Sequence, residues 1–288
     1  MFFRRLCLFN ALAACALGAA LNDVPRRGCA TEISPDEMRT VEAKFAEYKT
    51  LKALDDNRAD PSPISIAWHV IFTNQTVEGG YLNETTINAS VSALNDHYSG
   101  IGVNFTLDHV DYSQNTTWFI ETDPIYKTVE LEMKSALRVG DVATLNIYTV
   151  GFGTSHNNEL LGFATFPWWY ANSTIDDGVV ILHSTVPGGS KLHYDEGKTL
   201  THEVGHWLGL YHPFQGGCYG DGDFVSDTAP QVKPSYGCPV SQDSCIGGGP
   251  DNIHNFMDYS YDSCLDSFTP GQATRLREQM LYYRNATV

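Results

Sequence analysis

Basic residues are scarce in this chain of 288 residues, which has 18 Lys and Arg against 34 Asp and Glu and a formal net charge of −16. Nucleic acids and anionic membranes are bound through basic patches, and the sequence shows none. We therefore expect neither as a partner. The acidic composition mainly favours solubility, and the length suits one large domain or two closely packed subdomains, expected as a monomer.

Long apolar runs are absent after the N-terminus, where no segment approaches the ~20 consecutive apolar residues of a membrane helix. At the N-terminus, Arg4 and Arg5 precede an apolar stretch over 6–17, which is too short to span a bilayer, and small residues follow at 18–20. This arrangement predicts a secretory signal peptide at residues 1–20, and hence a secreted, extracellular protein.

Cysteines are also few, and no pair has the Cys-x-x-Cys spacing of a structural zinc site. Outside the predicted signal peptide there are five, of which Cys29 stands alone. The other four are Cys218, Cys238, Cys245 and Cys264. In an oxidising compartment four cysteines form two disulfides, for which three pairings are open.

Seven Asn-x-Ser/Thr sequons are present, and they fit a eukaryotic secretory route because N-glycans are added at this motif. The candidate asparagines are Asn74, Asn83, Asn88, Asn104, Asn115, Asn172 and Asn285.

One run of eleven residues carries the chemistry of the chain. Residues four apart on a helix share a face, so His202 and His206 can bind the same ion. Gly209 permits the left-handed conformation that ends a helix, after which His212 can approach that ion. Three neutral imidazoles leave a fourth position for water, as in catalytic zinc sites. Glu203 is placed to take a proton from this water.

The run is followed by a candidate methionine-containing turn over 255–259, centred on Met257. The extended histidine string with such a turn is the metzincin signature. The sequence of these motifs resembles most closely that of the pappalysin family and its fungal secreted extracellular metalloproteases. The resemblance covers essentially the whole mature chain, with further similar segments at residues 66–71, 145–148, 186–190 and 268–272.

The resemblance implies that His202, His206 and His212 bind zinc and that Glu203 is the general base and acid. It also implies that Tyr259 lies near the metal, where its phenol can stabilise an oxyanion. The alternative for this tyrosine is a buried aromatic residue with a satisfied hydroxyl group.

The resemblance further implies disulfides between Cys218 and Cys245 and between Cys238 and Cys264. Cys29 resembles a cysteine switch, in which a thiolate occupies the open position on the zinc and keeps a precursor latent. Ala30 stands where that motif has glycine. An unpaired or intermolecular cysteine is the alternative.

The implied fold is α+β and metzincin-like, with a mixed twisted sheet and helices above the cleft and a loop-rich lower subdomain pinned by disulfides. We expect an N-terminal segment at 21–60, a possible pro-region, and a catalytic domain at 61–288. Apolar periodicity predicts strands at 64–72, 103–107, 145–150 and 179–182, and helices from Ser34 onwards, at 87–98, 128–138 and 196–208, and after Pro270. The strand at 179–182 is our candidate edge for binding an extended substrate.

A second metal is suggested by hard oxygen ligands, which suit calcium, at Asp221, Asp223, Asp227 and Thr228. A plain acidic loop is the alternative. Other histidines have no ligand spacing and are interpreted as structural: His69, His183, His193 and His254.

These features predict a secreted zinc endopeptidase that hydrolyses proteins or peptides by means of a zinc-activated water. A non-catalytic, zinc-stabilised binding protein is the first alternative, disfavoured because the base and the open coordination position are intact. A zinc amidase acting on a small molecule is the second.

Overall fold

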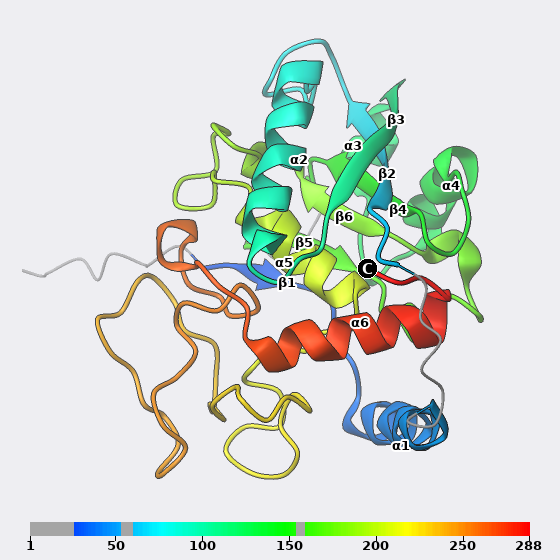
Figure 1. Cartoon of the computed structure of the whole chain (residues 1–288). Helices are drawn as coiled ribbons and strands as arrows, with labels where there is room; N and C mark the ends of the chain where they lie inside the picture. Colours follow the sequence, from blue (N-terminus) through cyan, green and yellow to red (C-terminus); the bar gives the residue numbers. More distant parts are fainter. Residues whose placement is uncertain (1–25, 53–59, 154–158) are drawn as a thin grey trace, which may run out of the picture.

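The computed structural model describes residues 26–52, 60–153 and 159–288 (Figure 1), so the predicted signal peptide lies outside the described residues. The strands are β1 (Gly28–Cys29), β2 (Ile64–Phe72), β3 (Phe105–Gln114), β4 (Leu145–Val150), β5 (Leu160–Ala164) and β6 (Val179–Leu182). The α-helices are α1 (Pro35–Lys52), α2 (Glu84–Ser99), α3 (Thr116–Glu121), α4 (Thr128–Leu137), α5 (Lys198–Trp207) and α6 (Pro270–Arg284). Short 3₁₀ turns are η1 (Pro167–Trp169), η2 (Thr174–Asp176), η3 (His183–Thr185) and η4 (Asp262–Cys264).

The six strands form one mixed sheet in the order β1-β5-β6-β4-β2-β3. Neighbours are parallel except β5 and β6, which are antiparallel. The predicted mixed α+β fold is thereby confirmed.

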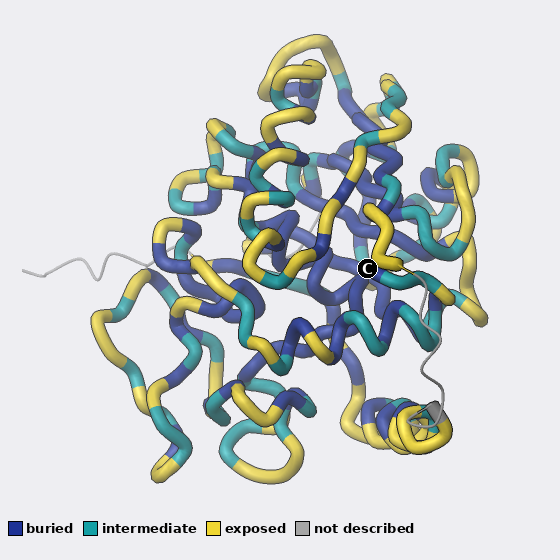
Figure 2. Tube along the Cα trace, in the orientation of Figure 1, coloured by how far each residue is buried: buried dark blue, intermediate teal, exposed yellow. Residues whose placement is uncertain are grey.

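Both faces of the sheet are covered, which explains why β2 is buried along almost its whole length. Ile66, Trp68 and Val70 belong to the core on the side of α2 and α5, whereas Ile71 belongs to a second core with residues of α3 and α4. Successive side chains of a strand point to opposite faces of the sheet, so the alternating apolar residues of β2 all lie in the first core. The dark interior of Figure 2 follows the sheet and α5.

The structure corrects the predicted substrate edge. Val179–Leu182 forms β6 as predicted, but this strand lies between β5 and β4 and has no free edge. Sequence patterns missed β5, because five residues that include Gly162 give too short a signal. The outer edge of β5 is paired with β1 of the N-terminal segment.

The N-terminal segment docks on the rest of the chain through α1. Ser34 caps this helix by accepting a hydrogen bond from the backbone N–H of Glu37 at 3.2 Å. Phe45 is buried and stacks on Tyr282 of α6, with ring centroids 5.9 Å apart. Glu42, also buried, accepts hydrogen bonds from both terminal nitrogens of Arg275 at 2.6 and 3.0 Å. Helices α1 and α6 are thus joined by an apolar contact and a bidentate ion pair.

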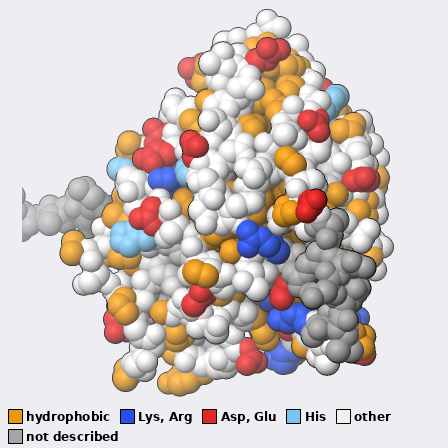
Figure 3. All heavy atoms as spheres, in the orientation of Figure 1, with side chains coloured by type: hydrophobic (Ala, Val, Ile, Leu, Met, Phe, Trp, Pro, Cys, Tyr) orange, Lys and Arg blue, Asp and Glu red, His pale blue; other side chains and the backbone are white. Residues whose placement is uncertain are grey.

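Below α5 the chain changes character. We call residues 60–207 the sheet half and residues 208–269 the loop half. The loop half contains no α-helix or strand, only η4 and an isolated bridge between Asn255 and Ser267. Disulfides join Cys218 to Cys245 within it and Cys238 to Cys264, which are the pairs that the family resemblance implies. On the face in Figure 3, acidic side chains are scattered and basic ones are few.

Candidate active site

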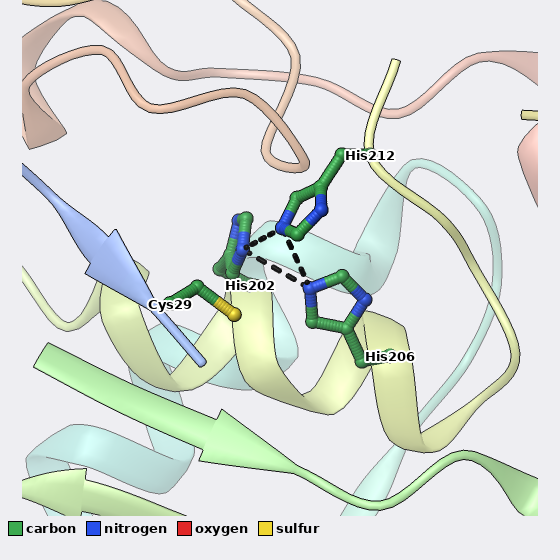
Figure 4. Close-up of side chains that lie close together, drawn as sticks. All are labelled: Cys29, His202, His206 and His212. Atoms are coloured by element: carbon green, nitrogen blue, oxygen red, sulfur yellow. Dashed lines mark hydrogen bonds between the residues drawn. The ribbon is translucent and has the colours of Figure 1, made fainter. Parts of the chain in front are cut away.

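Three imidazoles meet at the end of α5. His202 and His206 lie one turn apart on the helix, and His212 returns to them after the chain has turned (Figure 4). Their Nε2 atoms are 3.0 to 3.2 Å apart, and all three residues are buried.

The opposite ring nitrogens fix the orientation of two of these histidines. Nδ1 of His202 lies 2.8 Å from the carbonyl oxygen of Phe256, and Nδ1 of His206 lies 2.8 Å from that of Leu210. A carbonyl only accepts, so each Nδ1 carries the proton and each Nε2 presents a lone pair. Burial lowers the pKa of all three imidazoles, which keeps them neutral.

The arrangement fits a zinc ion. Lone pairs at 3.0 to 3.2 Å cannot satisfy one another, and ligands 2.0–2.1 Å from a tetrahedral ion are separated by about 3.3 Å. Buried polar atoms that lack a partner need a ligand, and here a cation meets that need.

Two glycines make the close packing around the histidines possible. Gly209 has a φ of 100°, and the turn at this point brings the N–H of Leu210 to the carbonyl of Gly205 at 2.9 Å. A Cβ on Gly205 would lie 2.3 Å from Sδ of Met257, which is fully buried beneath the helix. The predicted methionine turn therefore packs directly against α5.

Glu203 points from α5 toward the same space and is 1% exposed. Burial raises the pKa of its carboxyl group to about 8. A Cβ on Gly162 of β5 would lie 2.8 Å from Cγ of Glu203, so only glycine leaves room for this carboxylate beside the sheet. Its Oε2 lies 3.2 Å from the hydroxyl group of Thr31.

Cys29 enters this group from β1, as Figure 4 shows. Its sulfur and the three Nε2 atoms all lie within 4.8 Å of one another, and the thiol is 3.4 Å from Oε2 of Glu203. It forms no disulfide. The hydroxyl group of Tyr259 lies 3.3 Å from Nε2 of His212 and 3.4 Å from the carbonyl oxygen of Cys29.

A buried ion pair anchors the same segment. Arg27, two residues before the cysteine, is 2% exposed and lies 2.6 Å from Oδ1 of Asp262. Its guanidinium also lies over the ring of Tyr194. The N-terminal segment is thus held on both sides of the point where it crosses the three histidines.

The residues expected to bind calcium do not converge. Asp227 accepts hydrogen bonds from the hydroxyl group of Thr269 and the N–H of Gly271, at the start of α6. Asp223 accepts from the hydroxyl group of Thr228 at 2.7 Å, whereas Asp221 is exposed. Among the described residues, no potential metal-binding group of three includes these side chains.

Most sequon asparagines are exposed, and Asn115 is half-buried. Asn83 and Asn115 accept helix-capping hydrogen bonds through Oδ1, so these bonds do not use Nδ2, the atom that carries an N-glycan. No helix among the described residues is long and apolar enough to cross a membrane.

A second cluster, not anticipated from the sequence, brings together His69, His109 and Asp111 on β2 and β3. The one signal of this cluster in the sequence is the spacing of His109 and Asp111, which are two residues apart and so lie on one face of a strand. Their partner lies 40 residues earlier, so only strand pairing reveals the group. The other three histidines interpreted as structural are not part of either cluster.

Comparisons with known proteins agree with this site. A family model described as pregnancy-associated plasma protein-A matches residues 153–281, and one for reprolysin-like metallopeptidases of family M12B matches residues 84–213.

The structure of a Tannerella forsythia promirolysin mutant has a TM-score of 0.67 with this chain. It is 24% identical and covers 91% of this chain and 100% of its own. Mature mirolysin in complex with a cleaved peptide has a TM-score of 0.62, at 24% identity, over 80% of this chain and 100% of its own. Fold and site together define a metzincin-like metalloprotease.

Related sequences give the family. Extracellular metalloprotease 1 of Coccidioides posadasii is 41% identical over 95% of this chain and 96% of its own length. An extracellular metalloprotease of Sordaria macrospora is 40% identical over 100% of both chains. The chain belongs to the pappalysin family of metzincins, in its group of extracellular metalloproteases, and is a zinc metalloendopeptidase.

Proposed function

We propose that His202, His206 and His212 hold one catalytic zinc ion and that Glu203 is the proton carrier of a secreted endopeptidase. The observation that supports this best is the meeting of three buried Nε2 lone pairs beside a buried carboxylate. When bound, zinc supplies a Lewis acid that lowers the pKa of a coordinated water from about 15.7 to about 7.

The side chains then divide the proton transfers. Glu203 takes the proton of the attacking water and returns it to the nitrogen of the departing amine. Tyr259 donates its hydroxyl hydrogen to the carbonyl oxygen as negative charge develops there, a role supported by its position 3.3 Å from Nε2 of His212. The low exposure of both residues keeps the site dry, which strengthens such interactions.

The substrate is a protein or peptide bound in extended form on the outer edge of β5. This edge is the one that β1 covers: Gly28 donates to the carbonyl of Glu159 at 2.8 Å, and Ala30 donates to that of Gly162 at 3.2 Å. A peptide on this edge passes next to Glu203, because Gly162 touches that side chain.

The N-terminal segment keeps the enzyme latent. Its occupation of the strand edge and the position of the Cys29 thiol, within 4.8 Å of the three Nε2 atoms, both block access of a peptide. We therefore assign residues 21–60 to a pro-region and residues 61–288 to the catalytic domain. Removal of the segment activates the enzyme.

Calcium binding near Asp223 is retained as a lesser proposal. Oδ2 of this buried carboxylate has no hydrogen-bond partner, and a calcium ion would supply one. A rise in thermal stability with calcium that Asp223→Asn removes would support it, whereas identical unfolding in calcium and in EGTA would end it.

The first test is proteolysis. We expect the mature enzyme to cut a denatured protein mixture, with sites read by mass spectrometry, and 1,10-phenanthroline to stop it. Glu203→Gln should retain zinc and fold while activity falls by about 10²- to 10⁴-fold, the usual contribution of general acid–base catalysis. Full activity in this variant would refute the role of the carboxylate. Bound zinc without any cutting by the mature enzyme would favour the binding-protein alternative.

The second test addresses latency. In the unprocessed chain, Cys29→Ala should raise the rate of peptide cleavage by about tenfold or more, which corresponds to losing about 1.4 kcal/mol of blocking interaction. Lys44→Ala, an exposed change on α1, is the matched control and should leave latency unchanged. Equal latency in both variants would overturn the switch.

A further inference from the structure

The second histidine cluster lies on the strand pair at the far edge of the sheet from β1. In the register of β2 and β3, His69 faces Asp111 and Ala67 faces His109. The register shifts between Ile66 and Ala67, so β3 has one extra residue there. This bulge places His109 and Asp111 on the same face as His69, and bulges often re-aim side chains in this way.

The tautomer of His69 follows from its surroundings. Its Nε2 lies 3.0 Å from Oδ1 of Asn146. The amide of Asn146 is held in one orientation, because its Nδ2 donates to the carbonyl of Val139 and its Oδ1 accepts from the N–H of the same residue, both at 3.0 Å. Nε2 of His69 therefore donates and carries a proton.

In the neutral ring, the other nitrogen of His69 then presents a lone pair to the carboxylate of Asp111. Nδ1 lies 2.7 Å from Oδ2 of Asp111, and His69 is completely buried. Two acceptors at this distance repel unless a cation lies with them. Oδ2 is also 3.1 Å from Nε2 of His109, and Oδ1 of Asp111 is buried with no hydrogen-bond partner.

The geometry suits a metal ion. The three ligand atoms lie within 4.8 Å of one another, and separations of 2.7 and 3.1 Å are close to the ~2.9–3.3 Å between neighbouring ligands that are 2.0–2.1 Å from one ion. The side chains of His109 and Asp111 are 46% and 29% exposed, so an ion can enter from solvent and keep water ligands.

We propose that His69, His109 and Asp111 form a second metal site, separate from the active site, that binds one divalent ion of the zinc class. Two imidazoles and one carboxylate are ligands that zinc, nickel and copper accept, whereas calcium and magnesium prefer oxygen alone. The ion would bridge β2 to the edge strand β3. It would therefore stabilise that edge and take no part in peptide hydrolysis.

Zinc counting tests this site. The Glu203→Gln chain, which cannot digest itself, is loaded with zinc, dialysed and analysed for metal content. We expect two zinc ions per chain, one in the His109→Ala variant, and two in the Asp108→Ala variant, the matched control next to it on β3. A separate His202→Ala variant should lose only the active-site zinc and keep the zinc at His69, His109 and Asp111. Absence of the active-site zinc is therefore distinguishable from absence of the second zinc.

Two further measurements test the proposal even where dialysis removes a weakly bound second zinc ion. Calorimetry should show the affinity of the second zinc falling by at least tenfold in His109→Ala. Nitrogen-15 spectra should show Nδ1 of His69 without a proton when two zinc ions are bound. The proposal would be overturned by one zinc ion per chain in every variant except His202→Ala, together with a doubly protonated His69. The cation between His69 and Asp111 would then be a proton.

Discussion

The sheet half and the loop half of this molecule are stabilised by different interactions. In the sheet half, large apolar side chains such as Trp68 and Trp207 are fully buried in one continuous cluster. In the loop half, buried carboxylates take the central positions: Asp258 accepts from the N–H of Ser235, and Asp251 accepts from the N–H of Ser244, at 3.0 and 2.9 Å. In the loop half, hydrogen bonds and two disulfides are thus added to the apolar contacts of buried residues such as Leu210 and Met257.

This difference teaches where a metalloprotease of this kind needs covalent support. Loops leave backbone groups that no helix or strand pairs, and each must find a side-chain partner when buried. Cross-links that restrict the unfolded chain therefore add to the stability of the loop half.

The largest effect should come from the sheet half. Trp68→Ala removes a fully buried ring from the core, and substitutions of this kind cost about 3–5 kcal/mol through lost burial and a cavity. Denaturant unfolding should show this loss for the whole chain. Val240→Ala, at a completely exposed position of the loop half, should change nothing measurable. A local effect of Trp68→Ala that leaves the rest of the chain unchanged would contradict a continuous core.

A somewhat smaller effect is expected from removing a disulfide of the loop half. Changing Cys238 and Cys264 together to Ala should lower stability by about 2–4 kcal/mol, because the closed loop of 26 residues no longer restricts the unfolded state. Amide hydrogen exchange should accelerate in residues 208–269 and stay slow in β2 and β4. Equal acceleration in both halves would remove the distinction between them.

Local sequence patterns predicted some features of the two halves and missed others, and the reason is physical. The alternation of Ile66, Trp68 and Val70 reports burial directly, so β2 and its core could be placed. The zinc string was equally accessible, since its histidines lie on one helix turn and one short loop. The cluster of His69, His109 and Asp111 depends on a strand register and a bulge, which no local pattern encodes. The hydrogen bonds to Asp258 likewise depend on distant loops meeting.

The effect of acid should be no larger than that of the disulfide, and the stabilities of the two halves should respond to it with opposite sign. In the loop half, burial raises the pKa of Asp223 to about 6, above its unfolded value near 3.8. The folded state therefore binds the proton more tightly, and stability should rise by up to about 3 kcal/mol as pH falls from above 6 toward 4. Measured in EGTA, Asp223→Asn should lack this rise; an identical pH profile in both proteins would contradict it.

In the sheet half, burial alone would raise the pKa of Asp176, but the ammonium groups of Lys134 and Lys127 lower it to about 2. This carboxylate stabilises the fold above its unfolded pKa, and about 2 kcal/mol should be lost as pH falls from about 4 through 2. The difference in stability between the natural chain and Asp176→Asn should accordingly shrink over that range. A constant difference down to pH 2 would show that the ion pairs contribute nothing.

The outer edge of β5 is covered by residues of the same chain, and this has a kinetic consequence. A covalently tethered ligand acts at an effective concentration on the order of millimolar, whatever the concentration of the protein. Dilution into the extracellular medium therefore leaves the edge covered. One cut between the segment and the sheet turns the occupant into a diffusible molecule, which dilution then carries away. In the latency that we propose, the moment of cutting, rather than the amount of enzyme released, therefore sets when hydrolysis begins.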